Sequence, residues 1–225
     1  MTTADDDLDG FDGVARLFPL PNLVLFPGID QCLHVFEYRY RQMTADALAG
    51  DGRIALVLLS PDWEEQYDGR PAIQSVACLG RIVESEKLED GRYHLRLRGV
   101  ARIRIASELD APEKMYRVAR CEVLSEIPPA DLAEATEGRA QLRSAVLSRF
   151  DANGPAHKQL VGLFDSEVPL GPVCDQLAYG LPLPCELKQQ LLAEPTACVR
   201  DEILTHALRP QPRRDRPFPP NFSDN

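Results

Sequence analysis

The chain has 225 residues, of which 44% are hydrophobic and 27% are charged. These totals predict one or two globular domains, with a core large enough to need no disulfide or metal support. The formal net charge of −10 disfavours DNA and membranes as partners, because the field of the whole molecule repels anionic surfaces.

The first segment, residues 1–15, is acidic and contains five aspartates and two glycines. It predicts a flexible lead with little apolar surface to bury. It lacks the positive and apolar regions of a secretory signal, and no apolar run in the chain approaches the roughly 18–20 residues that span a bilayer. We therefore expect a cytoplasmic protein, in which the six cysteines stay reduced.

Residues 16–127 carry the pattern of β-strands. The run LVLFPG predicts a strand closed by Pro27–Gly28, and RIALVLLS at 53–60 predicts a buried strand. Two alternating runs flank Glu-Asp-Gly at 89–91, which is a strong signal for a hairpin. Gly99 lies where the alternation changes register, which favours a bulge. With a further alternating run at 116–126, the pattern predicts a curled antiparallel sheet or small barrel.

One helix interrupts these strands. Phe36, Tyr40, Met43 and Ala47 recur at steps of four, three and four, which places them on one helical stripe, and Gly50 follows as a stop. The spacing also predicts that Glu37 caps the start of this helix.

Residues 128–208 follow a Pro-Pro joint and read as a small helical bundle. The first helix carries Leu142, Val146 and Phe150 over about 20 residues and ends near residues 153–154. A second helix is predicted to start at Pro172, and two more lie in PCELKQQLLAE and TACVRDEILTHAL. Residues 209–225 are rich in proline and arginine and predict a disordered tail.

Motifs of the common enzyme classes are missing from the sequence, including the Walker phosphate loop, G-x-S-x-G, H-E-x-x-H and G-x-G-x-x-G. Cys32 and His34 form a possible nucleophile and base, since residues i and i+2 share a face of an extended segment. A core cysteine beside a strand-end histidine is the preferred explanation. The cysteines form no C-x-x-C pair, which disfavours a metal site. Together with the missing motifs, this predicts a protein without enzyme activity, metal or cofactor.

Two surfaces remain as candidates for binding. Six arginines fall on strands that should be neighbours and would form a basic strip for RNA if they share a face: Arg96, Arg98, Arg102, Arg104, Arg117 and Arg120. The alternative is a solvated face paired with glutamates across the strands. The polar loop SPDWEEQYDGRP holds Trp63 and Tyr67, which predict either a binding anchor or a cap over the end of the sheet.

Several segments together resemble the N-terminal domain family of Lon proteases. These are LFPLPNLVLFPG, then LHVFEYRYRQM, VACLGRIVESEKLEDGRYHLRLRGVARIRI and the helical half that includes KQQLL. The resemblance covers about residues 16–208. It implies an α+β fold, with a PUA-like β-barrel that has one inserted helix and is followed by a helical bundle. One departure is Tyr38, where members of the family often have proline.

The resemblance also implies a role in recognising and holding protein substrates. The four lysines of this chain do not fall in a recognisable catalytic setting, and we expect a stand-alone member without ATPase or peptidase modules. The expected function is a non-enzymatic module, adaptor or chaperone-like, that binds unfolded or extended polypeptide and works with a protease or another protein. Leu33, Phe36 and Tyr40, where the sheet meets the first helix, join Trp63 and Tyr67 as expected binding residues. RNA binding is the alternative.

Overall fold

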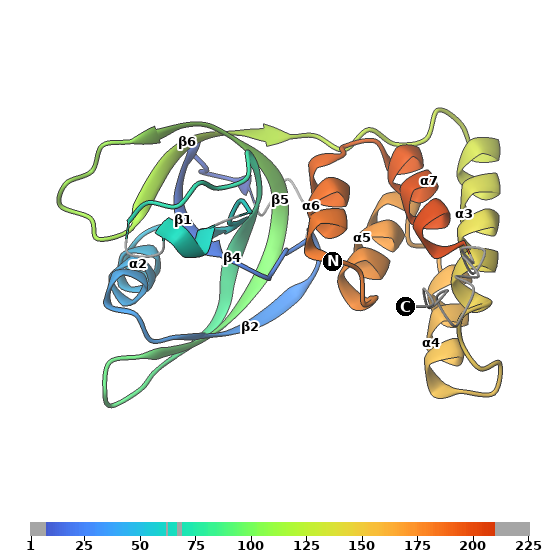
Figure 1. Cartoon of the computed structure of the whole chain (residues 1–225), viewed down its shortest axis with the longest axis horizontal. Helices are drawn as coiled ribbons and strands as arrows, with labels where there is room; N and C mark the ends of the chain where they lie inside the picture. The colour runs from blue at the N-terminus through green and yellow to red at the C-terminus, as the bar shows by residue number, and fades with distance from the viewer. Residues whose placement is uncertain (1–7, 62, 67–68, 210–225) are drawn as a thin grey trace, which may run out of the picture.

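The structure is a computed structural model and describes residues 8–61, 63–66 and 69–209. A curled sheet with one helix forms one half, and five helices form the other (Figure 1). The strands are β1 (Val14–Leu20), β2 (Asp30–Val35), β3 (Arg53–Leu58), β4 (Val76–Lys87), β5 (Tyr93–Leu109) and β6 (Arg117–Leu124). The helices are α2 (Tyr38–Ala49), the short 3-10 helix η1 (Trp63–Gln66), α3 (Leu132–Leu147), α4 (Pro155–Phe164), α5 (Leu170–Gly180), α6 (Cys185–Ala193) and α7 (Ala197–Leu208). This α+β architecture is the one expected.

The sheet has the order β2-β5-β4-β3-β1-β6, and β6 also pairs with β5, so the sheet curls back on itself. The sequence predicted antiparallel pairing throughout, but β1 and β3 run parallel, with Leu17 beside Ala55. The physical reason is the connection, because β2 and α2 carry the chain across before β3 begins, and such a crossover returns it in the same direction. The sheet is therefore mixed.

The hairpin between β4 and β5 is confirmed, with Gly91 at a positive φ of 81°. The predicted irregularity at Gly99 is confirmed as well, since Gly80 pairs with Gly99 while Leu79 pairs with Ala101. A Cβ on Gly99 would collide with the backbone carbonyl of Phe26, so the close approach of the two segments requires glycine. The bulge thus lets the chain before β2 lie against β5.

The run LVLFPG is not a strand, contrary to the prediction. Val24, Leu25 and Phe26 are buried but lie outside the ladder, and Pro21 and Pro27 on either side have no N–H to donate to it. The strand before this run, β1, begins at Val14, inside the segment expected to be a flexible lead. LVLFPG therefore fills the core between β1 and β2.

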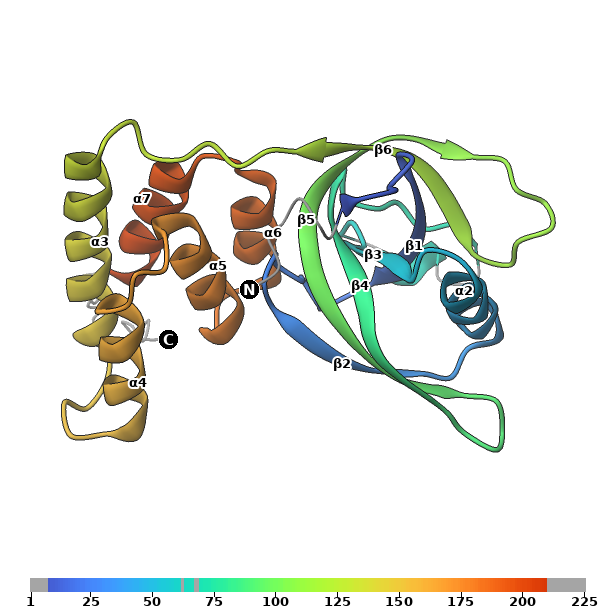
Figure 2. The same cartoon turned by 180° about the vertical axis from the view of Figure 1, so that it is seen from behind.

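Helix α2 lies at the end of the sheet away from the helical half (Figure 2). Its buried face consists of Tyr40, Met43, Thr44 and Ala47. The predicted stripe is confirmed from Tyr40 onward, but Phe36 precedes the helix and is 59% exposed. Gly50 is the C-cap, as expected.

The helical half contains one helix more than predicted. The first expected helix is α3, which ends at Leu147, before the predicted end near residues 153–154. The additional helix is α4, which begins with Pro155 at its first position in a segment where the sequence predicted no helix. Helix α5 begins at Leu170, two residues before Pro172. Among the described residues, we find no helix with the length and apolar character that a membrane crossing requires.

The two halves share one continuous hydrophobic core, which runs from Phe18 in β1 to Leu208 in α7. A buried ionic network joins them as well. The Arg102 guanidinium on β5 donates to the carbonyl of Leu192 at 3.0 Å and to the Asp175 carboxylate at 2.5 Å. Arg200 on α7 lies 3.5 Å from the same carboxylate and donates to Glu126. These contacts fix how the helical half sits on β5.

Candidate functional site

Four of the five predicted polypeptide-binding residues line one groove of about 560 Å³, namely Leu33, Phe36, Tyr40 and Trp63. The groove lies where the ends of β1 and β2 meet the start of α2 and the loop between β5 and β6. Tyr67, the fifth predicted residue, lies outside the described residues. The fold thus brings residues that are up to 30 positions apart in the sequence, Leu33 and Trp63, to the same groove.

Phe36 stands on one wall of the groove. Leu33 on β2 is half-buried below it, and the ring of His34 lies 6.1 Å from the Phe36 ring in a stacked arrangement. Because Phe36 comes between the end of β2 and the first turn of α2, neither the sheet nor the helix covers it. An aromatic side chain is thus presented to the groove with more than half of its surface exposed.

Tyr40 forms the floor. It is 5% exposed, its ring centroid lies 4.4 Å from that of Phe18, and the Arg39 guanidinium lies 4.6 Å from the ring centroid. The expected capping role of Glu37 is wrong, because its carboxylate makes no capping bond and instead pairs with Arg39 at 2.8 Å. The pair holds Arg39 across the tyrosine ring.

Met115 stands in the loop between β5 and β6, among the lining residues, and is 63% exposed. Its backbone N–H donates to the side-chain oxygen of Gln42 on α2 at 2.7 Å. The loop is also tied to α2 through Asp46, which accepts from the Tyr116 hydroxyl at 2.7 Å and from Lys114 at 2.9 Å. These bonds present the Met115 side chain to solvent on a fixed backbone.

The hydrogen bonds that Asp46 accepts from the loop favour its ionised form. Hydrogen bonds from Tyr116 and Lys114 lower the pKa of the Asp46 carboxyl, so it stays ionised as an acceptor. Burial and the bond to Asp46 raise the pKa of Tyr116 to about 12. Sequence reasoning missed Met115 because it lies in an irregular loop, and its one signal is an unbranched apolar residue in the polar run APEKMY.

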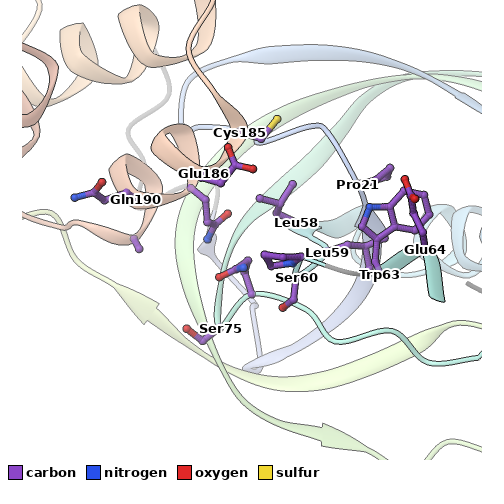
Figure 3. Close-up of a pocket in the computed structure, with 14 residues that line it drawn as sticks. Pro21, Leu58, Leu59, Ser60, Trp63, Glu64, Ser75, Cys185, Glu186 and Gln190 are labelled. Atoms are coloured by element: carbon purple, nitrogen blue, oxygen red, sulfur yellow. The ribbon is translucent and has the colours of Figure 1, made fainter. Parts of the chain in front are cut away.

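Trp63 forms a rim of the groove. It belongs to η1, is half-buried, and lines both this groove and a neighbouring cleft of about 650 Å³ (Figure 3). The sequence left open whether the tryptophan anchors a ligand or caps the sheet. Its place between two hollows fits an anchor, and its role in binding stays a prediction.

The remaining candidates from the sequence are a reactive Cys32–His34 pair and a metal site. Cys32 and His34 are both exposed on β2, and the His34 ring lies 5.0 Å from that of His94. Within the described part of the chain, no group of three or more His, Cys, Asp or Glu is placed to hold a metal ion.

The six arginines do not share one open face. Arg102 is buried in the junction between the two halves, at 4% exposure. Three others pair with carboxylates: Arg96 and Arg98 with Asp30, and Arg117 with Glu108. Arg104 and Arg120 are exposed. RNA binding stays a prediction of the sequence, and this geometry offers it no continuous basic strip.

Comparison with known proteins finds similarity over nearly all of the described chain. The family described as the ATP-dependent protease La (LON) substrate-binding domain matches residues 14–209. A Lon protease of Paraburkholderia phytofirmans is 30% identical over 193 residues, which are 84% of this chain and 23% of that protein. A Lon protease of Anaeromyxobacter dehalogenans is 25% identical over 179 residues, which are 80% and 21% of the two chains. The chain thus spans less than a quarter of the length of these curated relatives.

Two solved structures are similar over most of their length. One is described as a Lon N-terminal domain protein from Xanthomonas campestris, with 27% identity and a TM-score of 0.57, covering 86% of this chain and 97% of that chain. The other is the N-terminal domain of Mycobacterium avium complex Lon protease, with 15% identity and a TM-score of 0.68, covering 87% and 97%. The second likeness concerns the fold alone, and together the two match the expected sheet-and-bundle architecture.

Proposed function

The chain belongs to the family of Lon substrate-binding domains, and on this premise we propose that it binds extended polypeptide segments in the groove beside α2. The proposal includes a non-enzymatic, cytoplasmic role as an adaptor or chaperone-like binder, in which the bound segment is held for a protease or another protein. The family match supports substrate binding in general, and the adaptor role is our own step beyond it.

The observation that carries the proposal is the pair of exposed apolar side chains above an apolar floor. Phe36 and Met115 are 59% and 63% exposed, and both line the groove whose floor is Tyr40. Exposed large apolar residues gathered around a hollow are typical of sites that bind apolar parts of other chains. Methionine adapts its shape to varied partners, which suits a site that takes many sequences.

A direct test is the affinity of Phe36→Ala for a labelled, permanently unfolded protein, measured by fluorescence anisotropy. A phenylalanine side chain offers about 200 Å² of surface. The exposed 59% of it therefore offers about 120 Å² for burial, worth at most about 3 kcal/mol. Half of that gain corresponds to a loss of affinity of about tenfold. We expect Phe36→Ala to lose about this much.

The matched control is Leu132→Ala, since Leu132 on α3 is 82% exposed and lies in the other half of the molecule. This variant removes exposed apolar surface away from the groove and should bind like the unmodified chain. Equal affinity of all three proteins, or no binding by any of them, would remove the groove as the site.

A further inference from the structure

The cleft beside the groove lies between the two halves of the molecule. One wall is the end of β3 with η1, including Leu59, Ser60 and Trp63, and the other is α6, including Glu186 and Gln189. Figure 3 shows Glu186 reaching from α6 and Glu64 standing beside Trp63, with Leu59 and Ser60 between them. The groove and the cleft share Pro21, Leu59 and Trp63, so the two hollows adjoin at the tryptophan.

The polar groups of the cleft are rich in acceptors. Its charged lining residues, Glu64 and Glu186, are both acidic and both exposed, and the other polar lining residues are serines, glutamines and a cysteine. A carboxylate only accepts hydrogen bonds at neutral pH, and two of them without a basic neighbour in the lining attract a cation. The lining of the groove, by contrast, has more basic than acidic residues, namely Arg39, Arg70, Lys114 and Arg117 with Glu37 and Asp110.

Gln189 gives an independent indication of a ligand. The residue is 7% exposed and lines the cleft, and its amide nitrogen donates to the carbonyl of Val76 on β4 at 2.9 Å. That bond fixes the amide group, and the amide oxygen is buried without a hydrogen-bond partner among the described residues. A buried carbonyl oxygen without a donor is costly, and a ligand that brings an N–H would satisfy it.

We propose that the cleft binds a lysine or arginine side chain of the same polypeptide whose apolar residue occupies the groove. Both side chains carry several N–H donors and no acceptor, which complements two carboxylates and the Gln189 oxygen. The inference rests on the proposed function, because the groove supplies the apolar anchor. It adds a chemical rule, namely an apolar residue with a basic one at a short distance on one side of it.

The arrangement also restricts where the basic residue lies relative to the apolar anchor. Since the cleft lies on the Trp63 side of the groove, a basic residue can enter it from one side of the apolar anchor only. On the other side of the anchor it meets Arg39 and Lys114, which already pair with Glu37 and Asp46, so it gains no comparable attraction there.

The test uses the full chain and a set of labelled dodecamer peptides with one Leu-Phe anchor in a Gly-Ser background. A single lysine is placed at each position before and after the anchor, and affinities are measured by anisotropy against the peptide without lysine. We expect lysine to tighten binding about five- to tenfold on one side of the anchor only, and this gain to fall with added salt. Trp63, the one tryptophan, reports the same event by its fluorescence.

The decisive quantity is the ratio of affinities with and without lysine, measured within each variant. Glu64→Gln with Glu186→Gln should bring that ratio close to one, and Gln189→Met should lower it. Glu167→Gln, an exposed glutamate outside the cleft, should keep it. A reference peptide that binds with no gain from lysine, or a gain that survives loss of both glutamates, overturns this inference alone. If no peptide binds at all, the proposed function fails with it.

Discussion

Asp201 on α7 should make the protein less stable as the pH rises, and the substitution Asp201→Asn should remove this dependence. The residue is 4% exposed, and the gap left by Gly138 accommodates its carboxylate, because a Cβ on Gly138 would collide with it. Burial raises the pKa of Asp201 from 3.8 to about 7, with a contribution from Glu202, while the Thr205 hydroxyl opposes the shift. The folded state therefore keeps a proton that the unfolded chain gives up near pH 4.

The sign follows from proton linkage. Because the folded pKa lies above the unfolded one, the contribution of Asp201 is fully present below about pH 4 and is lost as the pH rises through about 7. A shift of this size corresponds to a loss of about 2.6 kcal/mol between pH 5 and pH 8. Relaxation around an ionised carboxylate reduces such a figure, so we expect the unfolding free energy to fall by about 1–2 kcal/mol in this window.

Asp201→Asn replaces the protonated carboxyl with a neutral group of the same shape, and it should remove this fall. The assay is urea unfolding followed by circular dichroism at pH 5, 6, 7 and 8 for both proteins. Glu167→Gln serves as the control and should follow the unmodified chain. Parallel pH profiles for Asp201→Asn and the unmodified chain would refute the reasoning.

Two further predictions concern the junction and the thiols. Asp175→Asn should lower the unfolding free energy by about 3–5 kcal/mol in the same urea assay, because it leaves Arg102 and Arg200 buried without their shared carboxylate; a loss under 1 kcal/mol would contradict this. In native protein at pH 8, a thiol reagent should label exposed Cys32 first. Burial raises the pKa of Cys78 to about 12, so that thiol should react only after denaturation, and equal labelling rates would contradict the buried placement.

Local patterns made part of the fold predictable. The hairpin at residues 89–91 and the end of α2 at Gly50 were predictable, because each depends on a few neighbouring residues with a strong backbone preference. The parallel pairing of β1 with β3 was not predictable in this way, because it depends on where a distant crossover returns the chain. Helix α4 was missed because it is short and contains Gly162, which weakens its helical pattern.

The groove, too, was only partly predictable from the sequence. Leu33, Phe36 and Tyr40 could be predicted to lie near one another because they are close in sequence, and all three line the groove. Met115 was missed because its place opposite them depends on hydrogen bonds between a loop and α2. Phe36 was assigned to a buried stripe on spacing alone, and its exposure arises because α2 begins two residues later. The periodicity thus located the segment around α2, but it could not show which of its side chains are exposed to solvent.

The burial of Arg102 at the junction between the two halves bears on the groove and the cleft. Its alternation with buried residues on β5 correctly indicated that it points away from them, but the helical half covers that side of the strand. A buried ion pair is a weak source of stability compared with apolar packing, whereas its bonds fix direction and distance. The cleft needs such fixing, since Trp63 belongs to one half and Gln189 to the other. The bonds of Arg102 to Leu192 and of Gln189 to Val76 hold α6 against the sheet. We infer that loosening this junction would weaken the preference for basic residues before it affects binding in the groove, because the groove is built from the sheet half alone.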